Sequence, residues 1–393
     1  MRTVTVVGAS LAGLYAAREL RAQGFDGRLV VVGDEPHPPY DRPPLSKGFL
    51  TGRSGEEHLA LADAEEIAAL DAEWLLGTRA RGLDTRCRTV LLEDGRTVSC
   101  DGVVIATGAS ARRFRGCERA GVHTLRSLDD ARALRAELLA GPRRVVVIGA
   151  GFIGAETASS CAGLGHEVTV VEAAPLPLIP QLGPRMAALC AALHRRGGVD
   201  LVTGAGVAAL RGTVAVTAVE LTDGRLLPAD VVIVGIGTIP NTGWLAGSKL
   251  ALRDGVLCDG GGVTELPRVV AVGDVARVGG IRAEHWTSAT EQPRVAVRNL
   301  LAGRTAETVR PLPYFWSDQY GARIQFAGRR ADTDTVRVVE GAITDGAPDE
   351  GGLLAVYERE GRTAAVLSVD RPRPFARVRR ELAGGAGARE AAA

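Results

Sequence analysis

The chain has 393 residues, of which 46% are hydrophobic, and this is enough for two or three domains with substantial cores. Its 47 basic and 46 acidic residues nearly cancel, so the net charge of +1 predicts neither a nucleic-acid nor a membrane partner. We expect no secretory signal, because a strand is expected almost from Met1, and the apolar runs are too short to span a membrane. The six cysteines lack a CxxC pair and the six histidines lack ligand spacing. We therefore expect free, buried thiols, a reducing cytoplasm and no metal site.

The first 47 residues predict a strand, a glycine turn, a helix and a second strand. The strand covers 3–7, the turn 8–13, the helix about 14–21, and the second strand 29–32, shortly before Asp34. Such a turn lets a pyrophosphate approach the N–H groups of a helix N-terminus, and the acid can accept hydrogen bonds from ribose. Ser10 stands where a second glycine is usual, which weakens the match without breaking it. An ordinary βαβ turn is the alternative.

The segments between the first unit and residue 110 predict further elements of the same domain. We expect a stiff, proline-rich segment at 39–47, an amphipathic helix at 56–70 and a strand at 74–80. Strands at 88–92 and 97–100 form a predicted hairpin, and a buried strand at 103–106 runs into Thr107 and Gly108.

A second, intact dinucleotide unit follows. A strand at 144–148 leads into a turn with all three glycines, a helix at 155–163, and a strand at 168–171 that ends in Glu172. Glu172 should accept from the adenosine 2′-OH and repel a 2′-phosphate, which favours NADH over NADPH. An internal repeat with only one working site is the alternative.

The rest of the chain predicts a return to the first domain and then a third domain. A strand at 230–236 ends the second unit, and a buried strand at 269–273 precedes Asp274, which could also cap the next helix, expected at 294–301. From Pro311 onward we expect a small α+β domain with strands at 323–326, 335–339, 353–358 and 363–369 and a basic helix at 375–382. Residues 384–393 are expected to be a frayed tail. The predicted domain boundaries are 1–113 with 242–312, 114–241, and 313–393.

Three motifs beyond the glycine turns resemble a known family. They are Tyr-Asp-Arg-Pro-Pro-Leu-Ser-Lys at 40–47, Glu-His-Trp at 284–286 and Phe-Trp-Ser-Asp-Gln at 315–319. In these motifs the chain is similar to the FAD- and NADH-dependent ferredoxin reductases of bacterial oxygenases and cytochromes P450. The resemblance implies an α/β fold with two Rossmann-like dinucleotide-binding domains, glutathione-reductase-like in arrangement, and a small C-terminal α+β domain.

The resemblance also implies roles for individual residues. It assigns Lys47, Glu156 and Trp316 to the redox centre. The residues implied to contact FAD are Gly8, Ser10, Ala12, Gly13, Asp34, Glu35, Arg42, Lys47, Ala80, Thr107, Gly108, Arg126, Gly273, Asp274, Glu284, His285 and Trp286. The residues implied to contact NADH are Gly149, Gly151, Phe152, Ile153, Gly154, Glu156, Glu172, Gly235 and Gly237. Simple packing for Phe152 and Trp316, and a solvated helix position for Glu156, are the alternatives.

The activity implied by the resemblance is electron transfer through FAD. FAD would accept hydride from NADH and pass single electrons to an acidic iron–sulfur ferredoxin, which would dock near a positive rim including Arg323, Arg329 and Arg330. A flavin-dependent NADH oxidase or disulfide reductase needs a redox cysteine near the flavin, and 40–50 contains none. A redox sensor similar to the apoptosis-inducing factors is the rival from another class.

Overall fold

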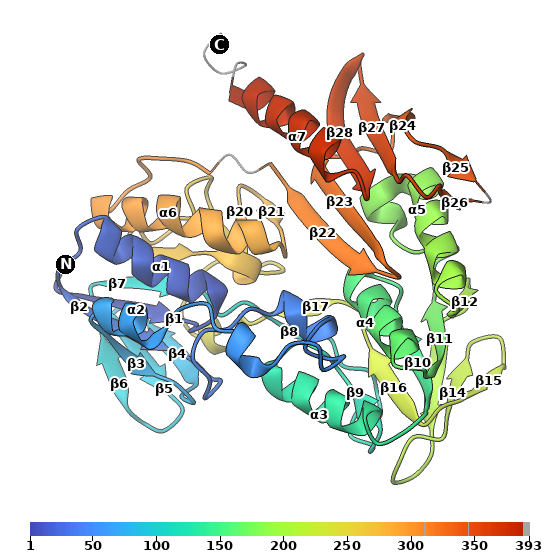
Figure 1. Cartoon of the computed structure of the whole chain (residues 1–393). Helices are drawn as coiled ribbons and strands as arrows, with labels where there is room; N and C mark the ends of the chain where they lie inside the picture. Colours follow the sequence, from blue (N-terminus) through green and yellow to red (C-terminus); the bar gives the residue numbers. More distant parts are fainter. Residues whose placement is uncertain (310–311, 345, 388–393) are drawn as a thin grey trace. The chain divides into compact units, whose positions relative to one another are not determined.

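The computed structural model describes residues 1–309, 312–344 and 346–387, and its chain divides into two compact units (Figure 1). Unit 1 comprises Met1–Asp41, Glu56–Ser110 and Thr238–Pro311. Unit 2 comprises Arg42–Gly55, Ala111–Gly237 and Leu312–Ala393. The segment 42–55 therefore packs with unit 2, although its neighbours on both sides belong to unit 1. The domain boundaries expected from the sequence stay a prediction.

Unit 1 contains a parallel five-stranded sheet in the order β19-β7-β1-β2-β3. The sheet strands are β1 (Thr3–Val7), β2 (Arg28–Val32), β3 (Ala72–Leu75), β7 (Gly102–Ile105) and β19 (Val269–Ala271). A small antiparallel sheet of β4 (Ala80–Asp84), β5 (Thr89–Leu92) and β6 (Thr97–Ser99) is inserted between β3 and β7. The other elements are α1 (Leu11–Ala22), α2 (Ala64–Ala69), α6 (Trp286–Ala302), β17 (Thr238–Pro240), β18 (Val256–Cys258), β20 (Ala276–Val278) and β21 (Ile281–Arg282).

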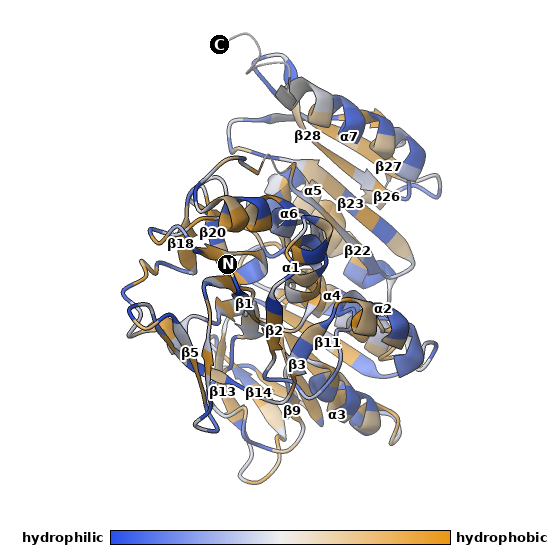
Figure 2. Ribbon diagram, turned by 90° about the vertical axis from the view of Figure 1, so that its left-hand side faces the viewer, coloured by the Kyte–Doolittle hydropathy of each residue, from blue (hydrophilic) through white to orange (hydrophobic). Residues whose placement is uncertain are grey.

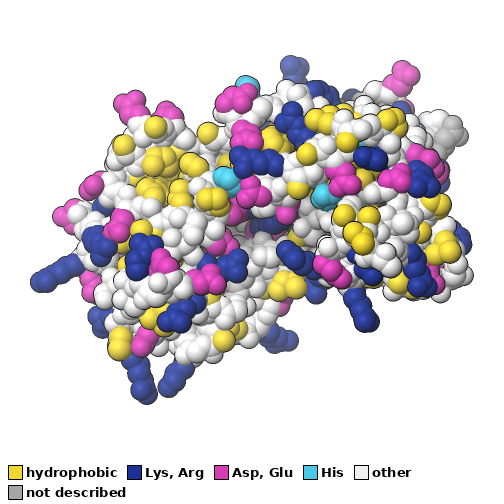
Figure 3. All heavy atoms as spheres, turned by 90° about the horizontal axis from the view of Figure 1, so that it is seen from below, with side chains coloured by type: hydrophobic (Ala, Val, Ile, Leu, Met, Phe, Trp, Pro, Cys, Tyr) yellow, Lys and Arg dark blue, Asp and Glu magenta, His cyan; other side chains and the backbone are white. Residues whose placement is uncertain are grey.

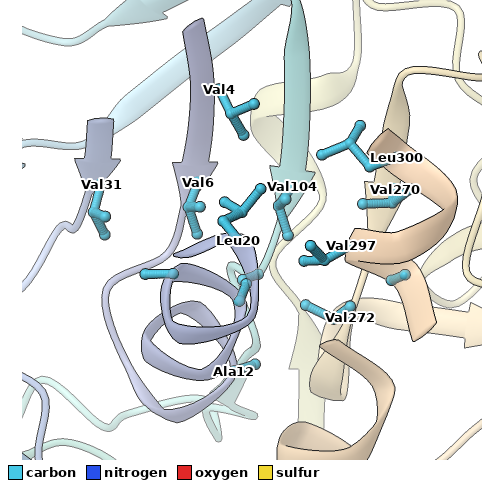
Figure 4. Packing of buried hydrophobic residues seen from close by; sticks show 14 of the residues in the cluster. Val4, Val6, Ala12, Leu20, Val31, Val104, Val270, Val272, Val297 and Leu300 are labelled. Atoms are coloured by element: carbon cyan, nitrogen blue, oxygen red, sulfur yellow. The ribbon is translucent and has the colours of Figure 1, made fainter. Parts of the chain in front are cut away.

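The core of unit 1 lies between this sheet and helices α1 and α6. Val4 and Val6 of β1 and Leu20 of α1 have no exposed surface, and α6 contributes Val297 and Leu300. Figure 4 shows these side chains converging from the strands and the two helices. Full burial of each such side chain contributes about 1.5–3 kcal/mol, so this layer fixes the end of β1 where the first glycine turn begins.

Unit 2 contains a second parallel sheet with an equivalent order, β12-β11-β10-β16-β9. The strands are β9 (Val122–His123), β10 (Arg144–Ile148), β11 (Glu167–Glu172), β12 (Asp200–Thr203) and β16 (Val231–Val234). Again a three-stranded antiparallel sheet, β13 (Val207–Arg211), β14 (Ala218–Leu221) and β15 (Leu226–Pro228), is inserted before β16. The helices are α3 (Leu128–Leu138), α4 (Phe152–Gly163) and α5 (Ile179–Arg196). The short strand β8 (Ala109–Ala111), of which Ala109 and Ser110 belong to unit 1, pairs with β17 of that unit.

The C-terminal part of unit 2 is an antiparallel sheet in the order β22-β23-β28-β27-β24. Its strands are β22 (Tyr314–Gln319), β23 (Ala322–Gly328), β24 (Thr335–Glu340), β27 (Leu353–Arg359) and β28 (Arg362–Val369); the short pair β25 (Ile343–Thr344) and β26 (Ala347–Pro348) and helix α7 (Pro372–Gly387) complete it. One buried cluster joins side chains of β23, β27 and β28 to α5. In Figure 2 these strands are largely hydrophobic, whereas α7 has many hydrophilic residues.

The surface agrees with the balanced composition. Figure 3 shows basic and acidic side chains interspersed over one face. Among the described residues, no helix combines the length and the apolarity needed to cross a membrane, and no group of three or more potential ligands could hold a metal ion.

Several predicted elements have different bounds in the structure. The helix expected at 56–70 is wrong for most of its length, because the side chain of Asp63 caps a short helix that begins at Ala64. The strand expected at 74–80 is two strands, which are separated by Gly77 with φ of +64°. Helix α6 begins at Trp286, well before the predicted residue 294.

The C-terminal part of the chain brings further corrections. The aromatic segment 314–319 forms strand β22, which was not predicted as a strand. Helix α7 continues to Gly387, so the expected tail is helical at its start, and 388–393 lie outside the described residues. The cysteines are free as expected, but Cys87 is exposed and Cys117 and Cys258 are only half-buried.

Candidate nucleotide-binding and redox site

The first glycine turn connects β1 to α1 in unit 1. Gly8 has φ of +119°, and a Cβ there would lie 2.1 Å from the carbonyl oxygen of Ala106 at the end of β7. A Cβ on Gly13 would lie 1.8 Å from the oxygen of Gly8. Both positions therefore require glycine, and the turn packs closely against the neighbouring strand.

The N-terminus of α1 is open to an anion. Ser10 is the N-cap residue, but its side chain makes no capping hydrogen bond, so the first N–H groups of the helix are not satisfied by it. Ala12 is buried, and a Cβ on Gly273 would lie 2.9 Å from the Ala12 Cβ. The structure thus brings together predicted residues from two segments of unit 1 around a helix end that suits a diphosphate.

The predicted ribose-binding acids lie just beyond β2. Asp34 is exposed and forms an ion pair with Arg79 at 3.5 Å. Glu35 accepts a hydrogen bond from the Tyr40 hydroxyl at 2.5 Å. Ala80, the first residue of β4, is buried and follows Arg79 directly. These residues share one end of the sheet, where the resemblance expects the adenosine half of FAD.

Thr107 and Gly108 are held by a residue that sequence reasoning missed. Asn241 donates from its Nδ2 to the Thr107 oxygen at 2.8 Å, and its backbone N–H donates to the Gly108 oxygen at 3.0 Å. The Thr107 hydroxyl donates in turn to the backbone carbonyl oxygen of Asn241 at 2.9 Å. Asn241 therefore fixes the loop after β7, and only its position after a Pro in the sequence hinted at a turn.

The segment from Gly273 to Trp286 supplies the remaining predicted FAD residues of unit 1. The Gly273 N–H donates to the Oε1 of Gln292 at 2.8 Å, and the Trp286 Nε1 donates to the Oδ1 of Asp41 at 2.9 Å. Gln292 and Asp41 orient two predicted contacts, and neither was singled out from the sequence. Asp274 lies within the short 3₁₀ turn Gly273–Val275.

His285 and Glu284 lie at the start of α6. His285 is the N-cap residue, and its burial lowers the pKa of the imidazole, an effect that the nearby Asp274 and Glu284 carboxylates oppose. Glu284 accepts hydrogen bonds from Thr238 and Arg282. A mainly neutral His285 in this position is suited to donating or accepting one hydrogen bond.

The second glycine turn connects β10 to α4 in unit 2. Gly149 has φ of +99°, and its Cβ would lie 2.4 Å from the oxygen of Gly235 at the end of β16. A Cβ on Gly154 would lie 2.0 Å from the oxygen of Gly149. At Gly151, the N-cap of α4, a Cβ would meet nothing within 4 Å. This space in front of a helix N-terminus suits the diphosphate of a second nucleotide.

The other predicted NADH residues surround this turn. Glu172 accepts from the N–H groups of Ala150 at 3.0 Å and Ala174 at 2.9 Å, so its carboxylate is fixed beside the turn. Ile153 is 50% exposed at the start of α4. The Gly237 oxygen accepts from the N–H of Arg112 at 2.9 Å.

Aromatic side chains gather at the start of α4 and on β22. Phe152 packs on Phe315 with ring centroids 4.6 Å apart, which supports a packing role for it. Trp316 stacks on Tyr314 at 5.7 Å.

The predicted FAD residues are divided between the two units. Arg42 donates to the backbone oxygen of Arg126 at 2.5 Å. Of the predicted FAD residues, Arg42, Lys47 and Arg126 thus belong to unit 2, as does Trp316 of the redox centre, and the remaining ones to unit 1.

A buried carboxylate at Glu156 forms the centre of unit 2's polar core. Glu156 is only 3% exposed, and its Oε2 accepts from the Lys47 Nζ and the Ser46 Oγ, each at 2.6 Å. Its Oε1 accepts from the Ser317 Oγ at 2.8 Å and from the Asp318 N–H at 3.2 Å. The alternative of a solvated helix position is therefore wrong. Four donors, one of which is the Lys47 ammonium, stabilise the ionised carboxylate in the interior.

The β22–β23 turn is anchored between α4 and α5. Tyr320 has φ of +53°, its N–H donates to the Ser159 Oγ at 2.7 Å, and its hydroxyl lies 2.8 Å from the Nδ1 of His194. Burial lowers the pKa of His194 to about 4 and raises that of Tyr320. A Cβ on Gly197 would lie 2.1 Å from the Tyr320 ring. This contact holds the antiparallel sheet on the second nucleotide-binding fold.

Arg330 does not support the expected positive rim. Its side chain is 11% exposed, pairs with Asp332 at 2.6 Å and donates to the Pro180 oxygen at 3.1 Å. Arg323 pairs with Asp318 at 3.5 Å, whereas Arg329 is exposed. Arg330 is therefore a structural residue that joins the antiparallel sheet to α5.

Comparisons with known proteins agree with this geometry. Residues 2–294 match the family model described as pyridine nucleotide-disulphide oxidoreductase, and 314–393 match the one described as reductase C-terminal. The biphenyl dioxygenase system ferredoxin–NAD⁺ reductase component of Paraburkholderia xenovorans is 37% identical over 380 residues, which cover 95% of this chain and 91% of that protein.

Two solved structures have similar folds along nearly the whole chain. Putidaredoxin reductase, in a covalent complex with putidaredoxin, matches with a TM-score of 0.90 and 33% identity, covering 97% of this chain and 93% of that one. The ferredoxin reductase for the CYP199A2 system from Rhodopseudomonas palustris matches with a TM-score of 0.87 and 32% identity, covering 94% and 91%. Both glycine turns fall within the residues that match the first family model, and the antiparallel sheet falls within those that match the second.

Proposed function

Because this chain belongs to the pyridine nucleotide-disulphide oxidoreductase family, and within it to the ferredoxin reductases, we propose that it transfers electrons from NADH to an iron–sulfur ferredoxin. The observation that carries the proposal is the pair of glycine turns, each with a Cβ-intolerant first and last glycine before a helix N-terminus. Two such turns suit two dinucleotides, which a transfer from one nucleotide to another requires. The ferredoxin would serve a cytochrome P450 or a Rieske dioxygenase.

A protein of this family uses a flavin and NAD(H), and we propose that the flavin is FAD. A flavin supplies the connection between a two-electron donor and a one-electron acceptor. The open N-terminus of α1 would hold the FAD diphosphate, with Asp34 and Glu35 on the ribose. Gly273, Asp274 and Trp286 would hold the ribityl chain and the ring. The uncapped helix and the Cβ-intolerant glycines of unit 1 fit such a ligand.

The second turn would hold NADH. Glu172 already accepts two backbone N–H groups, and each oxygen has a further lone pair for a ribose hydroxyl. A 2′-phosphate beside this carboxylate would be repelled, so we propose NADH rather than NADPH. The exposed Ile153 would contact the nucleotide at the start of α4.

Lys47 and Glu156 would serve the redox centre as a pair. The ammonium of Lys47 would stabilise negative charge on the reduced flavin, and the buried carboxylate would hold it in place. The aromatic residue of this centre would be Trp316, whose stacking on Tyr314 fixes the plane of its ring.

Disulfide reduction and NADH oxidation through a cysteine have little support. Burial raises the pKa of Cys161 and Cys190 to about 12, which leaves too little thiolate for exchange chemistry. Burial also dominates the raised pKa of Cys100. The free cysteines do agree with the proposed cytoplasmic location, where thiols stay reduced.

A visible spectrum of the purified protein tests the proposal. We expect flavin absorption that bleaches on anaerobic addition of NADH and returns when oxidised ferredoxin is added. A redox sensor of the other class would bleach slowly and pass few electrons to ferredoxin. A colourless preparation, or one that NADH does not bleach, would contradict the proposal.

A further inference from the structure

The direction of the hydrogen bonds around Glu156 can be worked out from its charge. An ionised carboxylate only accepts, so the hydroxyl of Ser317 must donate its single proton to Oε1. The Ser317 oxygen can then only accept from Gln319, whose side-chain amide lies 3.2 Å away. This requirement orients the Gln319 amide with Nε2 toward Ser317.

That orientation leaves one polar atom of Gln319 without compensation. Gln319 is 2% exposed, and within the described residues its Oε1 is buried with no hydrogen-bond partner. An unpaired buried amide oxygen destabilises a fold, and an apolar side chain of similar length would avoid that cost. The energetic cost of the unpaired Oε1 is explained if the hydrogen bond donated by the Nε2 of Gln319 is needed elsewhere in the site.

We propose that Ser317 and Gln319 are positioning residues for Lys47 and act through Glu156. Gln319 orients Ser317, and Ser317 holds Oε1 of Glu156 together with the Asp318 N–H, so the carboxylate cannot rotate. The other oxygen is thereby presented to the Lys47 ammonium at 2.6 Å. Strand β22 of the C-terminal sheet thus sets the place of a side chain from the segment 42–55.

The burial of Ser317 and the few other acceptors near Lys47 make the position of the Lys47 ammonium depend on the Ser317 hydroxyl. Ser317 is fully buried, so solvent cannot replace its hydroxyl. The Lys47 Nζ has two weaker acceptors of its own, the Pro43 oxygen at 3.0 Å and the Ser46 Oγ at 3.5 Å. If Glu156 turns away, Lys47 retains only these local contacts and becomes more mobile and more accessible.

The chain offers a direct readout, because Lys47 and Lys249 are its only two lysines. Lys249 is exposed in unit 1 and serves as the internal standard. In the purified full-length protein, competitive acetylation with trace acetic anhydride, followed by mass spectrometry, gives the reactivity of Lys47 relative to Lys249. We expect Ser317→Ala to raise this ratio about fivefold or more, corresponding to about 1 kcal/mol of lost protection.

Two further variants and a control distinguish a positioning role of Ser317 from a general destabilisation of the antiparallel sheet. Gln319→Met removes the amide donor but leaves Ser317, so we expect a smaller rise, and Ser317→Thr should restore the parental ratio because it keeps a hydroxyl. Ser368→Ala is the matched control, because Ser368 is also a fully buried serine of the same sheet and its Oγ accepts from the Arg371 N–H. We expect no change in this control.

The catalytic consequence rests on the proposed function, but the labelling does not. With NADH, Ser317→Ala should slow flavin reduction about tenfold while the Kd for NADH changes less than twofold. Failure of the parent protein to reduce ferredoxin would overturn the proposed function and leave the labelling result standing. An unchanged Lys47 ratio in Ser317→Ala and Gln319→Met, or an equal rise in Ser368→Ala, would overturn the positioning role.

Discussion

The two nucleotide-binding sheets have equivalent strand orders, yet they differ in the side chains around their glycine turns. Both place a Cβ-intolerant glycine directly after the first strand and another in the first turn of the helix. The position between them is Ser10 in unit 1 and Gly151 in unit 2. Backbone contacts with the neighbouring strand are therefore the shared requirement, and the middle position tolerates a small side chain.

The helices after the turns differ more than the turns themselves. Counting from the first glycine of each turn, Tyr15 in α1 corresponds to Glu156 in α4. Tyr15 makes an edge-to-face contact with Trp286, whereas Glu156 is the centre of a buried polar network. The same place in the two helices therefore holds a packed aromatic ring in unit 1 and a buried, hydrogen-bonded carboxylate in unit 2.

The largest expected effect tests the shared requirement for glycine. Gly149→Ala places a Cβ 2.4 Å from the Gly235 oxygen at φ of +99°. We expect the free energy of unfolding to fall by about 3 kcal/mol or more, measured by urea denaturation of the full chain. Gly151→Ala, where nothing lies within 4 Å, should change it by less than about 0.5 kcal/mol. Equal stability of the two variants would contradict this reading of the turn.

The next effect tests the polar network around Glu156 in unit 2. Lys47→Met leaves the carboxylate of Glu156 buried without its cation, so we expect a loss of about 3 kcal/mol in unfolding free energy. Flavin reduction by NADH should slow more than NADH binding weakens, as stopped-flow absorbance would show. Arg18→Met removes the more exposed ion pair with Glu66 in unit 1 and should cost less than about 1 kcal/mol. A similar loss of unfolding free energy in Lys47→Met and Arg18→Met would contradict the expected difference between the buried and the exposed ion pair.

A pH effect is expected from His194 in α5 of unit 2. The pKa of His194 is lowered by burial to about 4 from its ordinary value of 6.5. Between these values the unfolded chain binds a proton that the folded chain does not, so stability falls as the pH drops through this window. We expect a loss of about 2 kcal/mol between pH 7 and pH 5. His194→Gln should flatten this part of the stability–pH curve, and an unchanged slope would exclude His194 as its source.

A smaller effect concerns the acids after the second strand of each sheet. Glu172→Ala removes the carboxylate beside the second turn, and we expect the KM for NADH to rise about tenfold, about 1.4 kcal/mol, whereas the KM for NADPH should fall because the charge that repels the 2′-phosphate is gone. Asp34→Ala in unit 1 is the control and should leave both KM values unchanged. If NADPH remains as poor a substrate as before, Glu172 is not the residue that discriminates.

The smallest effect is expected at the middle position of the first turn. Ser10→Gly makes the two turns alike, and because the Ser10 side chain does not cap α1, the helix loses nothing from its removal. We expect the Kd of the apoprotein for FAD, measured by flavin fluorescence quenching, to change less than about threefold. A larger weakening would show that the hydroxyl binds the cofactor.

The periodicity of short segments predicted the elements around both turns well. The strands at 3–7 and 144–148 have the expected bounds, because β-branched residues, glycine and the following helix all lie within a few positions. The helix predicted at 56–70 was too long, because the amphipathic pattern starts before Asp63, whereas Asp63 is the N-cap of a helix that covers only Ala64–Ala69. Strand β22 was missed, because its aromatic residues suggested a cluster and its alternation was short.

The candidate site was only partly predictable. The glycines and Glu172 carry local signals, and the resemblance supplied Lys47 and Glu156. The partners that hold them, such as Asn241 and Ser317, are distant in sequence, and nothing in their local pattern indicates what they contact. Arg330 looked like a surface charge, yet its burial depends on α5, which packs against it only in the folded chain.

Asn241 lies where the chain returns to unit 1 after the segment 111–237 of unit 2. The chain leaves unit 1 at Ser110 and returns at Thr238, and Asn241 binds the exit segment through Thr107, Gly108 and the hydroxyl of Ser110 at 2.7 Å. The two ends of the excursion therefore meet within hydrogen-bonding distance. A linker of about three to five residues would be long enough to join these ends, but removing 111–237 would expose the faces of the segment 42–55 and of the antiparallel sheet that pack against it.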